Sequence, residues 1–268
     1  MPDRLKLLAV LAHPDDESLG FGGSLAKYAA EGVEVSLIVA TRGERGWRGP
    51  ADDDPGLEAV GGIREREVCA AAEVLGIGWV RFLDLIDGEM HLADHRAAAA
   101  RIAAQIRELR PQVVLTFDPR GGYGHPDHIA ISQLALSAVV LAADPTAAIT
   151  GSPFSVSKFY YRVWNREENG AFERVFGVLA LEIDGETRRI APWEEWSITT
   201  RIDTGDQMPL VWTAIQKHAS QVGSIQKLAE MPERIKAKLF GSEGYYRAFS
   251  LVNGGGERED DLFAGLRK

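Results

Sequence analysis

The chain has 268 residues, 45% of them hydrophobic, and a formal net charge of −9. This composition excludes a disordered or fibrous protein, and the negative charge argues against a nucleic-acid or anionic-membrane surface, because both need a basic footprint. The single cysteine, Cys69, excludes an internal disulfide and a thiolate metal cluster, and we expect it to be buried in a helix. With no evident signal peptide or membrane span, the cytoplasm is the expected location.

Strand and helix patterns alternate along the chain. Short apolar runs predict strands over residues 5–12, 33–40, 79–83, 112–117, 158–163, 178–183 and 198–202. Amphipathic or apolar stretches predict helices over residues 18–31, 63–75, 93–109, 129–141, 208–221 and 233–239. This alternation predicts an α/β fold, a Rossmann-like three-layer sandwich with a mostly parallel sheet and its site at the strand carboxyl ends. We expect a single domain over residues 1–268, with a flexible or docking tail from about residue 253.

The first predicted strand leads directly into His13-Pro14-Asp15-Asp16-Glu17. Pro14 disfavours helical geometry at His13 but suits a first helical turn, so strand should become helix within this segment. Three consecutive carboxylates repel one another unless a positive charge holds them, and a helix N-terminus supplies only about half a charge. A divalent metal ion would supply the rest. The alternative is that the carboxylates only cap a helix.

The same construction recurs after the strand predicted at 112–117, where a glycine-rich loop leads into His125-Pro126-Asp127-His128. Parallel strands end at the same edge of a sheet, so the two motifs should meet there. Asp127 is expected to support the site by orienting an imidazole or capping the following helix, and direct catalysis is its alternative role.

Together, His13, Asp16 and His128 offer two nitrogens and an oxygen. This set suits one catalytic zinc ion with three protein ligands and an open position, although such ligands also suit iron, manganese or cobalt. Asp15, Asp127 and His125 then remain for proton chemistry.

Both motifs resemble the signatures of the LmbE-like or PIG-L-type metal-dependent N-acetylglucosaminyl deacetylases. The similar segments are residues 12–17 and 125–128, and Lys217-His218-Ala219-Ser220-Gln221 resembles a third, weaker signature. Within the family, the loop 121–125 looks most like the mycothiol-type glucosaminyl-inositol deacetylases. That similarity implies that Tyr123 helps to hold an oxyanion, and the alternative is that the loop glycines only make a turn.

The resemblance also implies a role for each residue of the two motifs. It identifies His13, Asp16 and His128 as the zinc ligands and Asp15 as the general base. It implies that His125 polarises or protonates the substrate, and we expect His125 to act in its protonated form.

Four further residues are candidates for supporting roles. Glu44 lies in the loop 41–48, after the second strand, where it is expected to bind sugar hydroxyls unless the loop is simply solvated. Arg64 is a substrate-binding candidate by the same family resemblance, and pairing with nearby acids is its alternative. His218 and Gln221 are three apart and would share a helix face, so we expect them to support the primary site residues from behind.

These observations predict a zinc-dependent hydrolase that removes an acetyl group from an N-acetylglucosaminyl-type small molecule. The alternatives are an amidase acting on a bulkier conjugate such as a thiol conjugate, a metal-dependent phosphohydrolase, and a silent sugar-binding protein. The presence of Asp15 and His125 argues against a protein without catalytic activity, because sugar binding alone needs neither a base nor an acid. The expected partner is a small amino-sugar substrate, with no nucleic acid and no membrane, and a homo-oligomer remains open.

Overall fold

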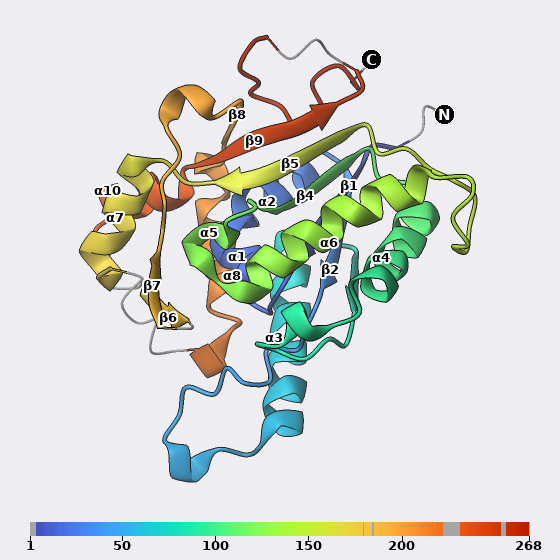
Figure 1. Cartoon of the computed structure of the whole chain (residues 1–268). Helices are drawn as coiled ribbons and strands as arrows, with labels where there is room; N and C mark the ends of the chain where they lie inside the picture. Colours follow the sequence, from blue (N-terminus) through green and yellow to red (C-terminus); the bar gives the residue numbers. More distant parts are fainter. Residues whose placement is uncertain (1–3, 179, 184, 222–230, 253–255, 268) are drawn as a thin grey trace.

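A seven-stranded sheet with helices on both faces forms the centre of the molecule (Figure 1). This computed structural model describes residues 4–178, 180–183, 185–221, 231–252 and 256–267. The strands are β1 (Lys6–Leu11), β2 (Glu34–Val39), β3 (Trp79–Phe82), β4 (Val113–Phe117), β5 (Lys158–Val163), β6 (Ala180–Ile183), β7 (Glu186–Arg189), β8 (Thr200–Asp203) and β9 (Ser242–Ser250). The α-helices are α1 (Asp16–Gly20), α2 (Gly22–Ala30), α3 (Leu57–Leu75), α4 (His95–Leu109), α5 (Gly121–Gly124), α6 (Pro126–Ala143), α7 (Arg166–Phe176), α8 (Met208–Ile215) and α10 (Glu233–Phe240).

The strand order is β3-β2-β1-β4-β5-β9-β8. The first five strands of this order pair in parallel, whereas β9 pairs antiparallel with both β5 and β8. The chain winds outward from β1 in both directions, so the topology switches between β1 and β4. In open α/β sheets, the crevice beyond the carboxyl ends at such a switch point is where ligands bind.

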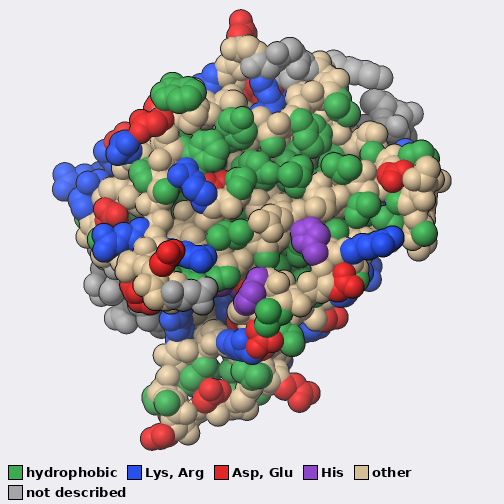
Figure 2. Space-filling view, viewed as in Figure 1, with side chains coloured by type: hydrophobic (Ala, Val, Ile, Leu, Met, Phe, Trp, Pro, Cys, Tyr) green, Lys and Arg blue, Asp and Glu red, His purple; other side chains and the backbone are tan. Residues whose placement is uncertain are grey.

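Helices cover both faces of the parallel part of the sheet. Figure 1 shows α4 and α6 on the near face and α2 and α8 behind the strands. This double cover explains why β1, β2 and β4 are almost entirely apolar and buried. Figure 2 shows hydrophobic side chains gathered over the upper part of the near face and charged side chains along its edges.

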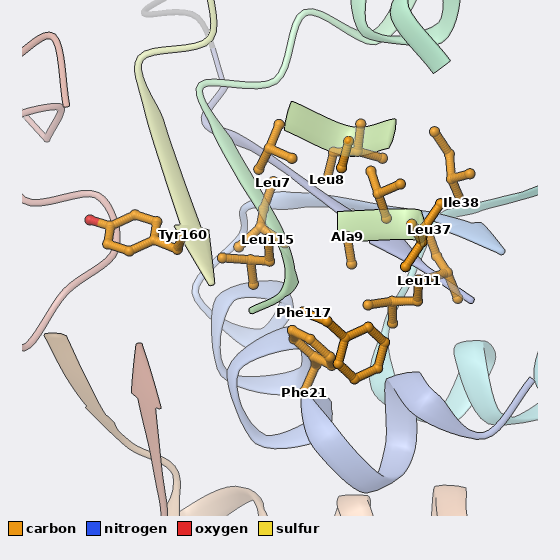
Figure 3. Close-up of a cluster of buried hydrophobic side chains, with 14 of the residues drawn as sticks. Leu7, Leu8, Ala9, Leu11, Phe21, Leu37, Ile38, Leu115, Phe117 and Tyr160 are labelled. Atoms are coloured by element: carbon orange, nitrogen blue, oxygen red, sulfur yellow. The ribbon is translucent and has the colours of Figure 1, made fainter. Parts of the chain in front are cut away.

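The core reaches up to the carboxyl ends of the strands. There the ring of Phe21 lies edge-on against Phe117, with centroids 5.4 Å apart, beneath the end of β1 (Figure 3). Phe21 also interrupts the helix predicted over 18–31, because its φ of −132° and ψ of −4° are not helical. The segment therefore forms two helices, α1 and α2.

Several other predicted elements have different bounds or surroundings. Helix α3 begins at Leu57, six residues before the expected start, and Cys69 is exposed on it rather than buried. The helix predicted over 208–221 ends at Ile215, and a separate 3-10 turn covers Ala219–Gln221. The strand predicted over 178–183 is not in the central sheet, because β6 pairs only with β7.

Four of the strands and α-helices given above were not predicted, namely α5, α7, β7 and β9. Helix α7 has a sequence signal, a capping box in which Asn165 and Glu168 bond each other's backbone amides.

The segment from about residue 253, expected to be flexible or to dock, lies against the chain's own sheet over its described residues 256–267. Leu262 and Phe263 are fully buried, and Lys158 Nζ donates to Glu259 Oε1 at 2.6 Å. The tail thus completes the core.

Helix α6 is the one described helix whose length and apolar composition would allow it to cross a membrane, contrary to the expectation that no such stretch exists. Just over half of it, 56%, is buried inside this fold, as in the core helix of a globular protein. Its role here is to cover the sheet and to carry His128.

Candidate metal centre

The two sequence motifs meet at the switch point between β1 and β4. His13 lies just beyond the end of β1, and Asp16 is the first residue of α1. His128 is in the first turn of α6, where Pro126 occupies the first helical position and His125 is the N-cap. The ring of His128 stacks on Phe117, with centroids 3.9 Å apart, so the apolar core forms the floor of the site.

The three predicted ligands lie close together, with both carboxylate oxygens of Asp16 near the imidazoles. His13 Nδ1 is 3.3 Å from His128 Nε2, His128 Nε2 is 3.3 Å from Asp16 Oδ1, and His13 Nδ1 is 3.8 Å from Asp16 Oδ2. Two ligands bound at zinc's usual distances of about 2.0–2.1 Å in tetrahedral geometry lie about 3.3 Å apart. The two distances from His128 Nε2 match this spacing, so a metal ion fits beside His128 between the two motifs. A nitrogen of His125 also lies within 4.8 Å of nitrogens of His13 and His128.

Two buried carboxylates hold the other nitrogen of His13. Nε2 lies 3.1 Å from Asp127 Oδ2 and 3.2 Å from Asp87 Oδ1. Asp127 Oδ2 also accepts the amide of Gly88 at 2.6 Å, and its Oδ1 accepts the amide of Met90 at 3.2 Å. Because these carboxylates accept a hydrogen bond from Nε2–H, Nδ1 is the nitrogen that can bind a metal, an arrangement common around zinc-bound histidines.

Asp87 was missed by the sequence reasoning. It follows the end of β3, and its Oδ2 accepts the amide of Arg45 at 3.0 Å. The available signal was a carboxylate just beyond a third parallel strand.

The charges of the site favour a cation between the two motifs. Burial opposes the protonated form of His13, but hydrogen bonds to Asp127 and Asp87 and the charge of Asp16 outweigh it and raise the pKa of His13 to about 10. Burial also opposes ionisation of Asp16, but the neighbouring charge of His128 outweighs it and holds the pKa of Asp16 well below its usual range. Without a metal ion, His13 is protonated, and a bound metal ion would take the place of that positive charge.

Asp15 lies beside the donor set in a strained conformation. Its φ of 112° is in the left-handed region, which costs a non-glycine residue about 1–3 kcal/mol. Its carboxylate accepts from Arg64 Nη2 at 3.0 Å. Burial raises the pKa of Asp15 despite the opposing charge of Arg64, which makes it a better proton acceptor near neutral pH.

His125 is held as a neutral imidazole. The amide of Asp127 donates to its Nδ1 at 3.1 Å, which leaves the proton on Nε2. Burial, with the charges of His128 and His13, lowers the pKa of His125 to about 4. The expectation of a protonated His125 is therefore not supported, and Nε2–H is a neutral hydrogen-bond donor.

The ring of Tyr123 lies edge-on against both His125 and His128. Its ring centroid is 5.8 Å from that of His125 and 5.3 Å from that of His128. Burial, together with the charge of Asp16, raises the pKa of Tyr123, so its phenol keeps its proton. The ring is therefore placed as a second neutral donor.

The glycine loop that carries Tyr123 is fixed by Asp118. The Asp118 carboxylate accepts the amide of Gly122 at 2.8 Å and Trp193 Nε1 at 2.6 Å. Gly122 has a φ of 68° and ψ of −85°, which glycine adopts readily.

The two predicted substrate-binding residues differ in their surroundings. Arg64 is buried, and it donates to the carbonyls of Gly43 and Pro14 as well as to Asp15, so the structure places it as an acid-pairing residue. Glu44 Oε1 accepts the amide of Asp87 at 2.8 Å, while its Oε2 is buried without a hydrogen-bond partner among the described residues. Glu44 thus has an oxygen available to a ligand.

His218 and Gln221 lie behind the site, but not on one helix face as expected, because α8 ends before them. His218 is almost fully buried, and its Nε2 donates to Glu17 Oε1 at 2.7 Å. Gln221 Nε2 donates to the carbonyl of Gly46 at 2.9 Å, and its Oε1 accepts from Arg48 Nε at 3.3 Å. Glu17 belongs to the first motif, but its contact with His218 could not be predicted from the sequence.

Known proteins resemble this chain over nearly its whole length. The profile of the PIG-L family, described as GlcNAc-PI de-N-acetylase, matches residues 8–139. A 1D-myo-inositol 2-acetamido-2-deoxy-alpha-D-glucopyranoside deacetylase from Streptomyces avermitilis is 37% identical over 302 residues, which cover 99% of this chain and 98% of the relative. The chain belongs to the PIG-L family.

Two further matches agree with membership of the PIG-L family. A mycothiol S-conjugate amidase from Streptomyces coelicolor is 33% identical, with 100% of this chain and 99% of the relative covered. The solved structure of a conserved protein from Thermus thermophilus is 26% identical, with a TM-score of 0.66 and coverage of 95% of this chain and 99% of that protein. The predicted three-layer α/β fold and the predicted class of amide-cleaving hydrolase are confirmed.

Proposed function

We propose that this PIG-L protein is a zinc-dependent deacetylase that hydrolyses the acetamido group of an N-acetylglucosaminyl-type small molecule. The observation that carries the proposal is the position of His128 Nε2, 3.3 Å from His13 Nδ1 and 3.3 Å from Asp16 Oδ1, with Asp15 close by in the same motif as His13. Two imidazoles and a carboxylate with an open side form the ligand set of hydrolytic zinc sites.

The chain's own residues divide the reaction between them. Zinc, when held by His13, Asp16 and His128, supplies a Lewis acid that polarises the acyl oxygen and acidifies water. Asp15 takes a proton from the attacking water and later returns it to the departing amine, so that amide and water become amine and acetate.

Two donors face the oxygen on which negative charge develops. The Nε2–H of His125 and the hydroxyl of Tyr123 are both neutral at physiological pH, and they stabilise this oxyanion by hydrogen bonding. Asp127 keeps the ring of His13 in its metal-binding orientation and, through its amide, the ring of His125 in its donating tautomer.

The substrate class rests on the relatives. The Streptomyces avermitilis relative is named for an inositol-linked 2-acetamido sugar, and a compound of this kind is the proposed substrate. Amide cleavage of a thiol conjugate is the second candidate, because the Streptomyces coelicolor relative is named for that reaction. Family membership favours amide hydrolysis over the alternative of a phosphohydrolase.

The domain organisation and the location of the enzyme are also proposals. We propose a single domain, supported by the packing of Tyr28, near the start of the chain, against Phe263, near its end, with ring centroids 5.3 Å apart. The cytoplasm remains the proposed location, with a small amino sugar as the partner.

One experiment tests metal, reaction and substrate together. Metal-free protein is reloaded with zinc, iron, manganese or cobalt and assayed for amine release from the acetamido-glucosyl inositol and from a thiol conjugate. The proposal expects one metal ion per chain and amine release from the acetamido sugar. Two ions per chain, or a His128→Ala variant with normal metal content, would contradict the ligand assignment.

A further inference from the structure

The turn of residues 218–221 contacts the segment that carries Asp15, although about 200 residues separate them in the chain. His218 and Glu17 are both almost completely buried, and His218 Nε2 donates to Glu17 Oε1 at 2.7 Å. A buried ion pair of this kind is costly unless both groups are held by good hydrogen bonds. The pair therefore fixes the position of the Glu17 carboxylate.

The second oxygen of Glu17 reaches the backbone of Asp15. Glu17 Oε2 accepts the amide of Asp15 at 3.0 Å, while the Asp15 carbonyl accepts the amides of Ser18 and Leu19 at 3.1 and 3.0 Å. Asp15 has a φ of 112°, a conformation that persists only where its surroundings fix it. The chain of contacts from His218 through Glu17 thus ends on the strained residue itself.

The same turn also contacts helix α3, which carries the arginine that pairs with Asp15. Ser220 donates from its amide to Glu67 Oε1 at 2.6 Å and from its hydroxyl to Glu67 Oε2 at 2.7 Å. Glu67 lies on α3 three residues after Arg64, whose Nη2 donates to Asp15 Oδ2 at 3.0 Å. The turn therefore contacts both Glu17, which binds the Asp15 amide, and the helix that carries Arg64.

We propose that His218 is a positioning residue for Asp15 and acts through Glu17, while Ser220 holds, through Glu67, the helix that carries Arg64. The inference rests on the proposed function, because it takes Asp15 as the base. His218 is only 2% exposed, and its Nε2 donates to Glu17 rather than to one of the proposed metal ligands.

The test is a double-mutant cycle in the zinc-loaded protein, assayed with the acetamido-glucosyl inositol. His218→Gln should lower kcat by roughly tenfold or more, with KM and metal content within about twofold of wild type. In an Asp15→Asn background the same change should alter the residual kcat by less than about twofold, because two residues that act as a unit are not additive. His95→Gln is the matched control, an exposed histidine that contacts Ser137.

Hydrogen exchange provides a readout that needs no substrate. Amide exchange over residues 13–19 should quicken in His218→Gln and in Glu17→Gln, but not in His95→Gln. If His218→Gln does not fold, Glu17→Gln and Ser220→Ala carry the same comparison.

The failures can be told apart. A wild-type protein that releases no amine from any amide offered overturns the proposed function and this inference with it. In an active protein, unchanged exchange and kcat in the variants, or an equal loss of kcat with and without Asp15, overturns the inference alone.

Discussion

Asp127 Oδ2 lies 3.1 Å from His13 Nε2, although the two residues follow different strands and stand 114 positions apart. The same oxygen accepts a hydrogen bond from the amide of Gly88, and this bond helps to fix the position of the carboxylate beside the imidazole. With Asp87, which lies 3.2 Å from the same nitrogen, Asp127 thus orients His13 so that Nδ1 is free for a metal ion.

Asp127→Asn should therefore weaken metal binding. The amide keeps the shape of the carboxylate but loses its charge, and loss of such a partner typically costs about 10–100-fold in metal affinity. A competitive titration with a zinc chelator measures the change. Asp206→Asn, at an exposed aspartate, is the control, and equal affinities for Asp127→Asn and wild type would rule out this role.

Metal uptake should release protons. The pKa of His13 is raised to about 10 in the metal-free protein, so below that pH the ring carries a proton that must leave when Nδ1 binds a metal. Affinity should accordingly rise with pH up to about 10. Calorimetry at a pH of about 7.5 in buffers of different ionisation enthalpy counts the protons, and His13 alone should contribute about one. Binding heats that do not depend on the buffer would refute a protonated His13.

His125→Ala should retain the metal but lower kcat by about 10²–10³, the usual cost of removing one oxyanion donor. Because the pKa of His125 is lowered to about 4, the ring stays neutral through the working range and should not produce an alkaline limb. The acid limb belongs to Asp15, whose raised pKa means that kcat/KM falls as the pH drops through it. His91→Ala is the control, and a metal-free His125→Ala protein would instead make His125 a ligand.

The sequence was enough to predict the parallel half of the sheet and the convergence of His13 with His128. Strand ends can be read from local patterns, and parallel strands bring their carboxyl ends to one edge. Asp87 and Glu17 could not be assigned, because their roles depend on partners that only the folded chain supplies. The break at Phe21 was also missed, although the glycines at positions 20, 22 and 23 around it are weak helix formers.

The most direct test of the account is amine release by wild-type and Asp15→Asn proteins at matched zinc content. The substrate is the acetamido-glucosyl inositol, and Asp52→Asn, at an exposed aspartate, is the control. Asparagine fills the same space but cannot accept the water's proton. We predict that Asp15→Asn binds one zinc ion per chain and loses at least about 10² of the wild-type kcat. Near-normal turnover by zinc-loaded Asp15→Asn would contradict the account.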